Sequence, residues 1–363
     1  MADADSAEGN EIGRRSTATQ DPLSSTTISN LNDVAHELSF LQDLANRGSW
    51  NLILDAVSRA RSGSLLTAPH DHLTYMAFSA LSLTKLGRFK DALAELDSLD
   101  DFDSHHYRYE TYPKIYPSRS GSMVPFVLRW LHAILPVKLS KSKEGLDRLY
   151  LLLGFVRERI LNHEDKTTSL GKIWRQREYA ILSCIIGQHV AAMEFNTCLE
   201  VINDAALRGF CDPFLVSKLG LVQMHMGNLE GAKASFEWVE KAIEEDDEGN
   251  ARNLIGRNKA LMFVANKEYV SAVREYEECI ERDPMDTVSI NNKALCLMYL
   301  RDLGDSIKGL EGALQRVPTV AMKEPLLVNL CSMYELAYVN HSDIKRTLTN
   351  WVSKVAPDDF HFP

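Results

Sequence analysis

A six-residue frame recurs along this chain. It usually has glycine at the first position, and it has a bulky side chain at the third and alanine at the sixth. It reads Gly87-x-Phe89-x-x-Ala92, Gly187-x-His189-x-x-Ala192 and Gly227-x-Leu229-x-x-Ala232, and Lys267-x-Tyr269-x-x-Ala272 repeats it without the glycine. A small residue stands seven positions before each frame, namely Ala80, Ala180, Gly220 or Ala260. Antiparallel helices that approach closely need small side chains at their contact, so each frame predicts a helical hairpin. The chain is therefore expected to be an array of stacked hairpins.

The spacing of these hairpins indicates the kind of repeat. Pro284 and Pro318 lie 34 residues apart, each where a second helix should stop, and this is the tetratricopeptide period. The intervals 173–213 and 213–253 are about 40 residues, which also fits a HEAT-type array. The recurrent frame favours tetratricopeptide repeats, with the additional residues forming loops such as 244–250. An all-α superhelical solenoid with a concave groove follows from this interpretation.

The clearest unit predicts its own packing, because Gly220 should meet the returning helix while Gly227 turns the chain and Phe236 fills the layer between hairpins. Further units begin near Val34, Leu73, Ile173, Asn253 and Thr287, with an atypical last pair from Met322. The apolar pattern of 126–161 adds a degenerate hairpin. We expect about seven to eight hairpins over residues 33–340, a disordered polar N-terminus over 1–32, and a C-terminal capping helix and tail over 341–363.

Charge and hydropathy exclude two classes of function. The 363 residues include 40 Lys+Arg against 50 Asp+Glu, a formal charge of −10 without a basic stripe, so nucleic acid is not an expected partner. The longest uncharged stretch, residues 179–193, is too short and too polar to span a bilayer. Residues 1–10 lack the basic and apolar regions of a signal peptide. A cytoplasmic protein that reaches membranes only through partners is expected.

The sequence carries no recognisable catalytic motif. Phosphate-binding loops, dinucleotide fingerprints, zinc-protease motifs and nucleophile elbows are missing from it. The pairs His70/His72 and His105/His106 have no second ligand pair at a matching spacing, so they are interpreted as solvated loop histidines. The six cysteines form no CxxC pair and are interpreted as reduced core residues. We expect neither an enzyme nor a cofactor or metal site.

One segment, residues 100–124, interrupts the helical pattern. It contains Tyr107, Tyr109, Tyr112, Tyr116, Pro113 and Pro117. A long non-helical stretch inside a compact array is usually functional or disordered, and tyrosines are typical of contacts that are buried at one end and wet at the other. The sequence therefore predicts a partner-binding loop that includes Tyr112, Tyr116, Met123, Phe126 and Trp130.

A second candidate site lies on the first helices of consecutive hairpins. Its residues are Lys218, Arg257, Asn258, Asn291, Asn292 and Lys323. Guanidinium and amide donors suit the C-terminal carboxylate of a peptide, which would make the chain a co-chaperone-like module. The alternative, which we favour, is that asparagines at this position bond a neighbouring helix.

Three stretches outside the generic repeat resemble one family. They are Tyr112-Pro113 to Tyr116-Pro117 with Gly121-Ser122-Met123-Val124-Pro125-Phe126 and Leu131-His132-Ala133, then Asn291-Asn292-Lys293-Ala294-Leu295-Cys296-Leu297, then Asn329-Leu330 with Met333-Tyr334-Glu335-Leu336. Over about residues 34–340 the chain resembles the subunit-twelve family of the trafficking protein particle (TRAPP) complex. It departs from that family at both ends, since the long N-terminal extension of animal relatives is nearly absent and residues 339–363 differ. Functions of those tails are not carried over.

The resemblance implies a non-catalytic subunit of a vesicle tether that supports Rab GTPase activation in ER–Golgi and Golgi traffic. Nucleotide exchange would belong to the small core subunits of the complex. This chain would be an adaptor that joins a large subunit resembling subunit eleven to that core, and its link to a Rab GTPase would be indirect. It would be cytoplasmic and peripherally associated with Golgi membranes.

Overall fold

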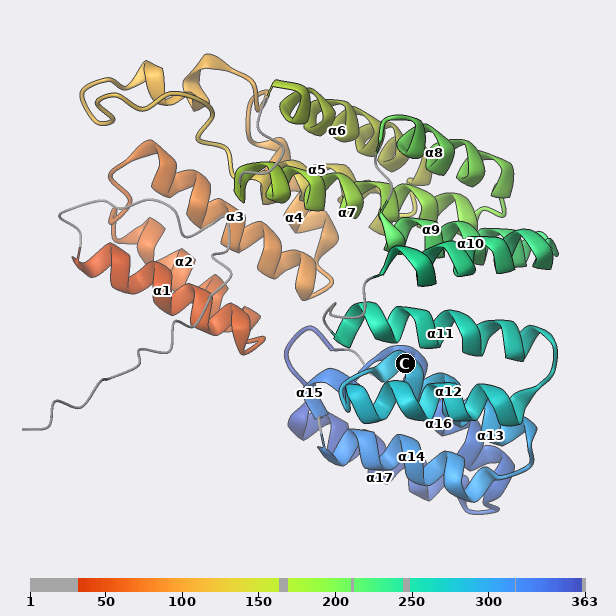
Figure 1. Ribbon diagram of the computed structural model, residues 1–363. Coiled ribbons are helices and arrows are strands. Elements are labelled where there is room, and N and C mark those ends of the chain that lie inside the picture. Colours follow the sequence, from red (N-terminus) through yellow and green to blue (C-terminus); the bar gives the residue numbers. More distant parts are fainter. Residues whose placement is uncertain (1–31, 163–168, 210–211, 244–248, 317, 361–363) are drawn as a thin grey trace, which may run out of the picture.

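The computed structural model describes residues 32–162, 169–209, 212–243, 249–316 and 318–360, and these form an all-α solenoid (Figure 1). The first helices are α1 (Asn32–Asn46), α2 (Trp50–Ser62), α3 (Pro69–Lys85), α4 (Phe89–Asp97), α5 (Phe126–Lys138), α6 (Ser142–Asn162), α7 (Ser169–Ala191) and α8 (Phe195–Leu207). The rest are α9 (Pro213–His225), α10 (Leu229–Ala242), α11 (Gly249–Ala265), α12 (Tyr269–Arg282), α13 (Thr287–Tyr299), α14 (Leu303–Arg316), α15 (Pro318–Ala321), α16 (Glu324–Ala337) and α17 (His341–Val355). Within these ranges the strand-like pairing is limited to one isolated bridge, between Arg108 and Ser122.

The helices pair into eight antiparallel hairpins, from α1–α2 to α13–α14 and finally α16–α17. Each hairpin packs on the next, and the helix pairs with substantial contact are close neighbours along the chain. Figure 1 shows the hairpins stacked in chain order along a curved path. The tetratricopeptide-type solenoid of about seven to eight hairpins expected from the sequence is confirmed.

Seven of the hairpin turns share one backbone geometry. A residue with positive φ lies two positions before the second helix, and these residues are Gly48, Gly87, Ser140, Met193, Gly227, Lys267 and Arg301. Five positions later comes a buried residue that packs on the first helix, in order Ile53, Ala92, Gly145, Cys198, Ala232, Ala272 and Ser306. Glycine adopts positive φ without steric cost, which explains why it marks three of these turns in the sequence.

The frame at Gly187 is not a turn, and this prediction is wrong. Gly187 lies inside α7, which continues to Ala191, and the chain turns at Met193 with a φ of 59°. Phe195 and Cys198 then occupy the two later positions of the frame. The true turn lacks a glycine, so the matching letters six residues earlier gave a false phase.

The close approach expected at Gly220 is present. A Cβ atom added to Gly220 would lie 2.3 Å from Cε1 of Phe236, and Ala232 is fully buried beside this contact. Cysteines also belong to the core, since Cys198 and Cys279 have no exposed surface and burial raises the pKa of both thiols. Five of the six cysteines are free thiols, and Cys211 lies outside the described residues, as do residues 1–31 and the loop 244–248.

The tail after α17 returns to the first two hairpins. The backbone N–H of Asn51 donates to Oδ2 of Asp358 at 3.0 Å, and that of Asp358 donates to the carbonyl of Gly48 at 3.3 Å. Lys85, on α3, donates to Asp359 at 3.0 Å. These contacts join residues about 300 positions apart in the sequence, so the array of hairpins closes on itself.

Candidate interaction surface

The segment between α4 and α5 forms a closed, hydrogen-bonded loop, seen in amber at the upper left of Figure 1. Its two arms meet at the Arg108–Ser122 bridge. Across this bridge the N–H of Tyr109 donates to the carbonyl of Gly121 at 3.0 Å, and the N–H of Met123 donates to the carbonyl of Tyr107 at 2.7 Å. The backbone of the loop is therefore fixed before any partner binds.

Tyr116 fastens the loop to α3. Its side chain is 5% exposed, and its hydroxyl lies 2.6 Å from Nδ1 of His70, with the two rings edge to face. Burial lowers the pKa of His70, while nearby Asp71 acts in the opposite direction. Because His70 is buried in α3, its interpretation as a solvated loop histidine is wrong. His72 is exposed but also lies in α3 and not in a loop, whereas His105 and His106 are exposed between α4 and α5.

The five loop residues chosen from the sequence fall into two groups. Tyr116 and Met123 are buried together in the cluster beneath the loop, so they support the loop from inside. Tyr112, Phe126 and Trp130 are half-buried, and of these only Tyr112 belongs to the loop, because Phe126 and Trp130 lie in α5. Ile115, which the sequence analysis did not single out, is 50% exposed at the loop tip. Its only sequence signal was an apolar residue between two tyrosine–proline pairs.

The groove candidates are largely occupied by contacts within the solenoid. Nη1 of Arg257 lies 3.4 Å from Oδ1 of Asp286, whose side chain is 3% exposed. Asn258 is 2% exposed and accepts a hydrogen bond from the Ser217 hydroxyl at 2.8 Å. Neither side chain is presented freely to a peptide in the groove.

Asn291 and Asn292 also serve neighbouring helices. Asn291 accepts from the Asn329 amide at 2.8 Å, and Asn292 donates to the Tyr276 hydroxyl at 3.4 Å. Lys218 lies apart from this group, over the ring of Tyr179 at 5.8 Å, and burial lowers its pKa. Lys323, the sixth groove candidate, is an exposed residue directly before α16. The contacts of Asn258, Asn291 and Asn292 match the interpretation in which asparagines bond a neighbouring helix.

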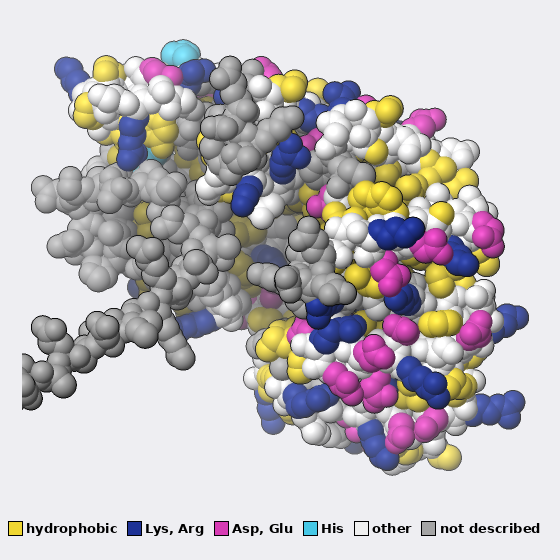
Figure 2. Space-filling model, viewed as in Figure 1, with side chains coloured by type: hydrophobic (Ala, Val, Ile, Leu, Met, Phe, Trp, Pro, Cys, Tyr) yellow, Lys and Arg dark blue, Asp and Glu magenta, His cyan; other side chains and the backbone are white. Residues whose placement is uncertain are grey.

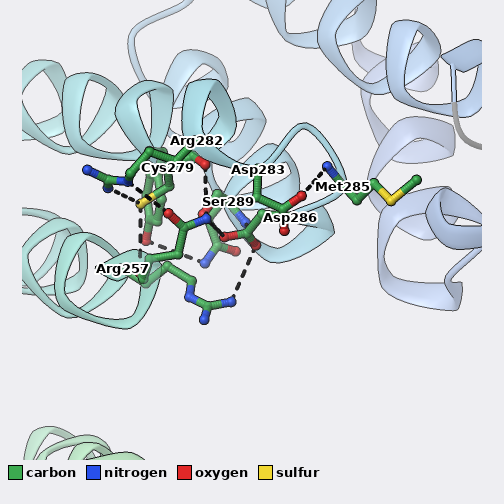
Figure 3. Close-up of polar contacts among 10 residues, drawn as sticks. Arg257, Cys279, Arg282, Asp283, Met285, Asp286 and Ser289 are labelled. Carbon is green, nitrogen blue, oxygen red and sulfur yellow. Dashed lines mark hydrogen bonds and ion pairs between the residues drawn. The ribbon is translucent and has the colours of Figure 1, made fainter. Parts of the chain in front are cut away.

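Figure 3 shows the polar network around Arg257, which sequence reasoning missed. The side-chain amide of Asn253 donates to Asp286 at 3.0 Å and to the backbone carbonyl of Cys279 at 2.9 Å, while Nε of Arg282 donates to Oδ1 of Asn253 at 3.0 Å. Asp286 also caps α13 by accepting from the backbone N–H of Ser289 at 3.1 Å. An aspartate directly before a helix start was the available signal. The network ties α11, α12 and α13 together.

Neither a metal site nor a membrane span is visible in the part of the chain described. Across those ranges there is no group of three histidine, cysteine, aspartate or glutamate side chains placed to hold a metal ion. Likewise, no helix in those ranges has the length and apolar character needed to cross a membrane.

Comparison with curated proteins gives a relationship over nearly the whole chain. Trafficking protein particle complex subunit 12 of Homo sapiens is 28% identical over 364 residues, covering 92% of this chain and 49% of that protein. The Mus musculus protein of the same name is 29% identical over 365 residues, covering 91% and 45%. This chain is similar to trafficking protein particle complex subunit 12. The resemblance expected from the sequence is confirmed, and the chain spans about half the length of these subunit-12 proteins.

Other comparisons add little to the relationship with subunit 12. No protein-family profile matches the chain. Among solved structures, a tetratricopeptide repeat protein from Parabacteroides merdae is 12% identical with a TM-score of 0.45, over 79% of this chain and 98% of that one. NprR in complex with its peptide NprX is 15% identical with a TM-score of 0.44, over 88% and 90%. The fold assignment rests on the hairpins of this chain themselves.

Proposed function

We propose that this chain is a non-catalytic adaptor subunit of a TRAPP-type tethering complex. The observation that carries the proposal is the alignment with subunit 12, which covers 92% of the chain and hence nearly the whole solenoid. Stacked hairpins expose a long surface on a rigid frame, which suits a protein that holds others in place. The partners are other subunits of the complex, namely a large subunit resembling subunit eleven and the small core subunits.

Through that assembly the chain supports Rab GTPase activation and traffic between the ER and the Golgi. The chain itself holds other subunits in position, because nucleotide exchange belongs to the small core subunits. It is cytoplasmic and meets Golgi membranes peripherally, through the complex. This role needs large protein surfaces and no reacting group of its own.

The loop of residues 100–124 is the interface that we propose for one of these partners. Met123 and Tyr116 anchor it, while Ile115 is 50% exposed at its tip and Tyr112 is half-buried. A loop that is already ordered loses little conformational entropy on binding, and exposed apolar groups beside tyrosines are common at the centres of interfaces. Peptide carboxylate binding by the groove residues is the weaker proposal, because Arg257, Asn258, Asn291 and Asn292 already have partners within the solenoid.

Affinity purification of the tagged full chain from its own cells, followed by mass spectrometry, tests the role. Recovery of small and large TRAPP subunits supports it, and recovery of chaperones alone contradicts it. The interface is tested with Ile115→Glu, which should reduce at least one subunit in the purified complex by fivefold or more. Leu207→Glu is the matched control, because Leu207 is an exposed leucine on α8, 89% exposed and outside the loop.

The anchoring residues need a separate variant, since changing a buried side chain can unfold the loop. Tyr116→Phe removes only the hydroxyl that contacts His70 and keeps the ring in the core. It should leave co-purification nearly intact while lowering thermal stability. If Ile115→Glu co-purifies like the wild type, the loop tip is not the interface, even when the complex itself is recovered.

A further inference from the structure

A pocket of about 590 Å³ lies where the loop meets α5, α6 and α7. Its charged lining consists of three arginines, Arg129, Arg159 and Arg177, and its sixteen lining residues include no aspartate or glutamate. The whole chain, in contrast, has ten more acidic than basic residues. On the face shown in Figure 2, the C-terminal hairpins carry acidic and basic side chains interleaved. The pocket is thus a local concentration of positive charge in an acidic protein.

The three arginines differ in how their charge is used. Arg129 is 9% exposed and is paired with Asp103, with donor–acceptor distances of 2.7 and 3.3 Å, and this hydrogen bonding lowers the pKa of Asp103. Arg159 and Arg177 make no ion pair with any carboxylate of the described residues. Arg159 still acts on Asp103 from a distance, since its charge contributes to the lowered pKa of that carboxyl, whereas Arg177 has no carboxylate partner in the described part of the chain.

Arg177 is held in a fixed orientation by aromatic rings. The centre of its guanidinium lies 4.4 Å from the ring centroids of both Phe126 and Trp174, and those two rings meet edge to face. Burial lowers the pKa of Arg177. Stacking uses the flat faces of a guanidinium and leaves its N–H groups, which point outward in the plane, able to donate to a ligand. A partly desolvated, preorganised guanidinium binds a carboxylate with two parallel hydrogen bonds.

The surroundings of the arginines indicate what else a ligand must carry. Phe155 lies beneath Arg129 and Arg159, at 4.3 and 5.1 Å from the two guanidinium centres, and Leu170 adds a further apolar wall. The loop contributes Ser120, Gly121 and Ser122, whose side chains are small, to the lining. The volume lies within the range of pockets that hold ligands.

We infer that this arginine–aromatic pocket binds an acidic peptide segment of a partner protein, in which a glutamate or aspartate stands next to a large apolar residue. The carboxylate would meet Arg177 and Arg159, and the apolar side chain would lie against Phe155 and Leu170. Charge complementarity selects this occupant, because within the described residues Arg177 meets no carboxylate and Arg159 forms no ion pair, although its charge reaches Asp103. The inference goes beyond the proposed role in a tethering complex, since it concerns the chemistry of one pocket.

The test uses the purified full chain and a fluorescein-labelled hexapeptide of alternating glutamate and phenylalanine, with both ends blocked. Fluorescence anisotropy should show saturable binding that weakens as salt is raised from 50 to 300 mM. A peptide with glutamine in place of glutamate should bind at least tenfold more weakly. Equal binding of the two peptides overturns the inference, as does the absence of any binding.

Variants of the chain locate the binding. Arg177→Gln should weaken binding at least tenfold, and Arg159→Gln at least threefold. Arg159 is exposed, so its loss cannot act by unfolding the core. The charge-matched control is Arg274→Gln, an exposed arginine of α12 outside the pocket, which should bind within twofold of the wild type. If Arg159→Gln and Arg177→Gln bind like the wild type, or if the control loses as much, the inference is wrong.

A phosphotyrosine peptide without acidic residues serves as a competitor. If it displaces the glutamate peptide at tenfold lower concentration, the pocket prefers phosphate and the inference of a carboxylate ligand is overturned. These results are independent of co-purification. Recovery of TRAPP subunits together with indifference to the acidic peptide would reject the pocket alone.

Discussion

The contact at Gly220 makes a sharp prediction about the stability of the solenoid. In Gly220→Ala, the new methyl group would lie 2.3 Å from Cε1 of Phe236 and 2.8 Å from both Cδ1 and Cζ. Such an overlap in a packed layer costs about 1–3 kcal/mol. Alanine also favours a helix over glycine by about 1 kcal/mol. Because three ring atoms are involved and Phe236 is 7% exposed, we place the steric cost in the upper half of its range.

The net expectation is that Gly220→Ala lowers the free energy of unfolding by about 1–2 kcal/mol. Gly187→Ala is the matched control, since Gly187 is an exposed residue inside α7 with no neighbouring heavy atom within 4 Å of its added Cβ. This variant has only the effect of the higher helix propensity of alanine, so its free energy of unfolding should rise by about 0.5–1 kcal/mol. The two substitutions are identical in chemistry and should be opposite in sign.

Urea unfolding followed by circular dichroism measures both variants. The midpoints should move in opposite directions while the slope with urea stays constant. The double variant Gly220→Ala/Phe236→Leu should be more stable than the sum of the single changes, because the smaller side chain relieves the overlap. A Gly220→Ala protein as stable as the wild type would refute the packing argument. If Gly187→Ala lowered the free energy of unfolding by more than about 1 kcal/mol, the original prediction of a turn at Gly187 would be supported instead.

Three further predictions concern other parts of the molecule. Asp286→Ala removes the cap of α13 and leaves Arg257 without its partner, so the free energy of unfolding should fall by about 3 kcal/mol in urea titrations, whereas Asp286→Asn should lose less than half of that. The pKa of His70 is lowered in the folded chain, chiefly by burial and further by Arg119 against the opposing effect of Asp71, so the unfolded chain takes up the proton more readily. Stability should therefore fall as the pH drops below about 6.5, and thermal melts at pH 7.5 and 5.5 should show a smaller difference for His70→Gln than for the wild type. Removing residues 357–363 should speed hydrogen exchange at the Asn51 amide and increase the radius of gyration measured by solution scattering. If neither value changes, the tail contacts do not hold the array closed.

The sequence predicts the hairpins well because the repeat is a local property. Gly87 and Gly227 mark their turns with positive φ, and the buried alanines follow at a fixed distance. Met193 adopts the same backbone conformation, but methionine in the sequence gives no signal of a positive φ. A glycine in a helix carries no turn by itself, so the frame at Gly187 gave the wrong phase.

The candidate surface was less accessible to sequence reasoning. The loop could be located because its composition breaks the helical pattern, yet the burial of Tyr116 depends on His70, which lies 46 positions earlier. The arginine–aromatic pocket has the same character, since Phe126, Phe155 and Trp174 come from three different helices. Contacts of this kind are fixed by the superhelical stacking, which no local spacing encodes.

The contacts of Asp358 with the first hairpin and of Asp359 with Lys85 in the second hairpin change the elastic behaviour of the solenoid. A row of stacked hairpins with free ends behaves as a spring, in which each layer can tilt without regard to distant ones. When its two ends are held together, the same row becomes a closed ring. A change in the angle between two neighbouring hairpins must then be offset by changes in the other hairpins of the ring. Exposed polar contacts are weak, and the tail is held by only a few of them. Under mechanical load the contacts at Asn51 and Lys85 would therefore break before any pair of stacked hairpins separated.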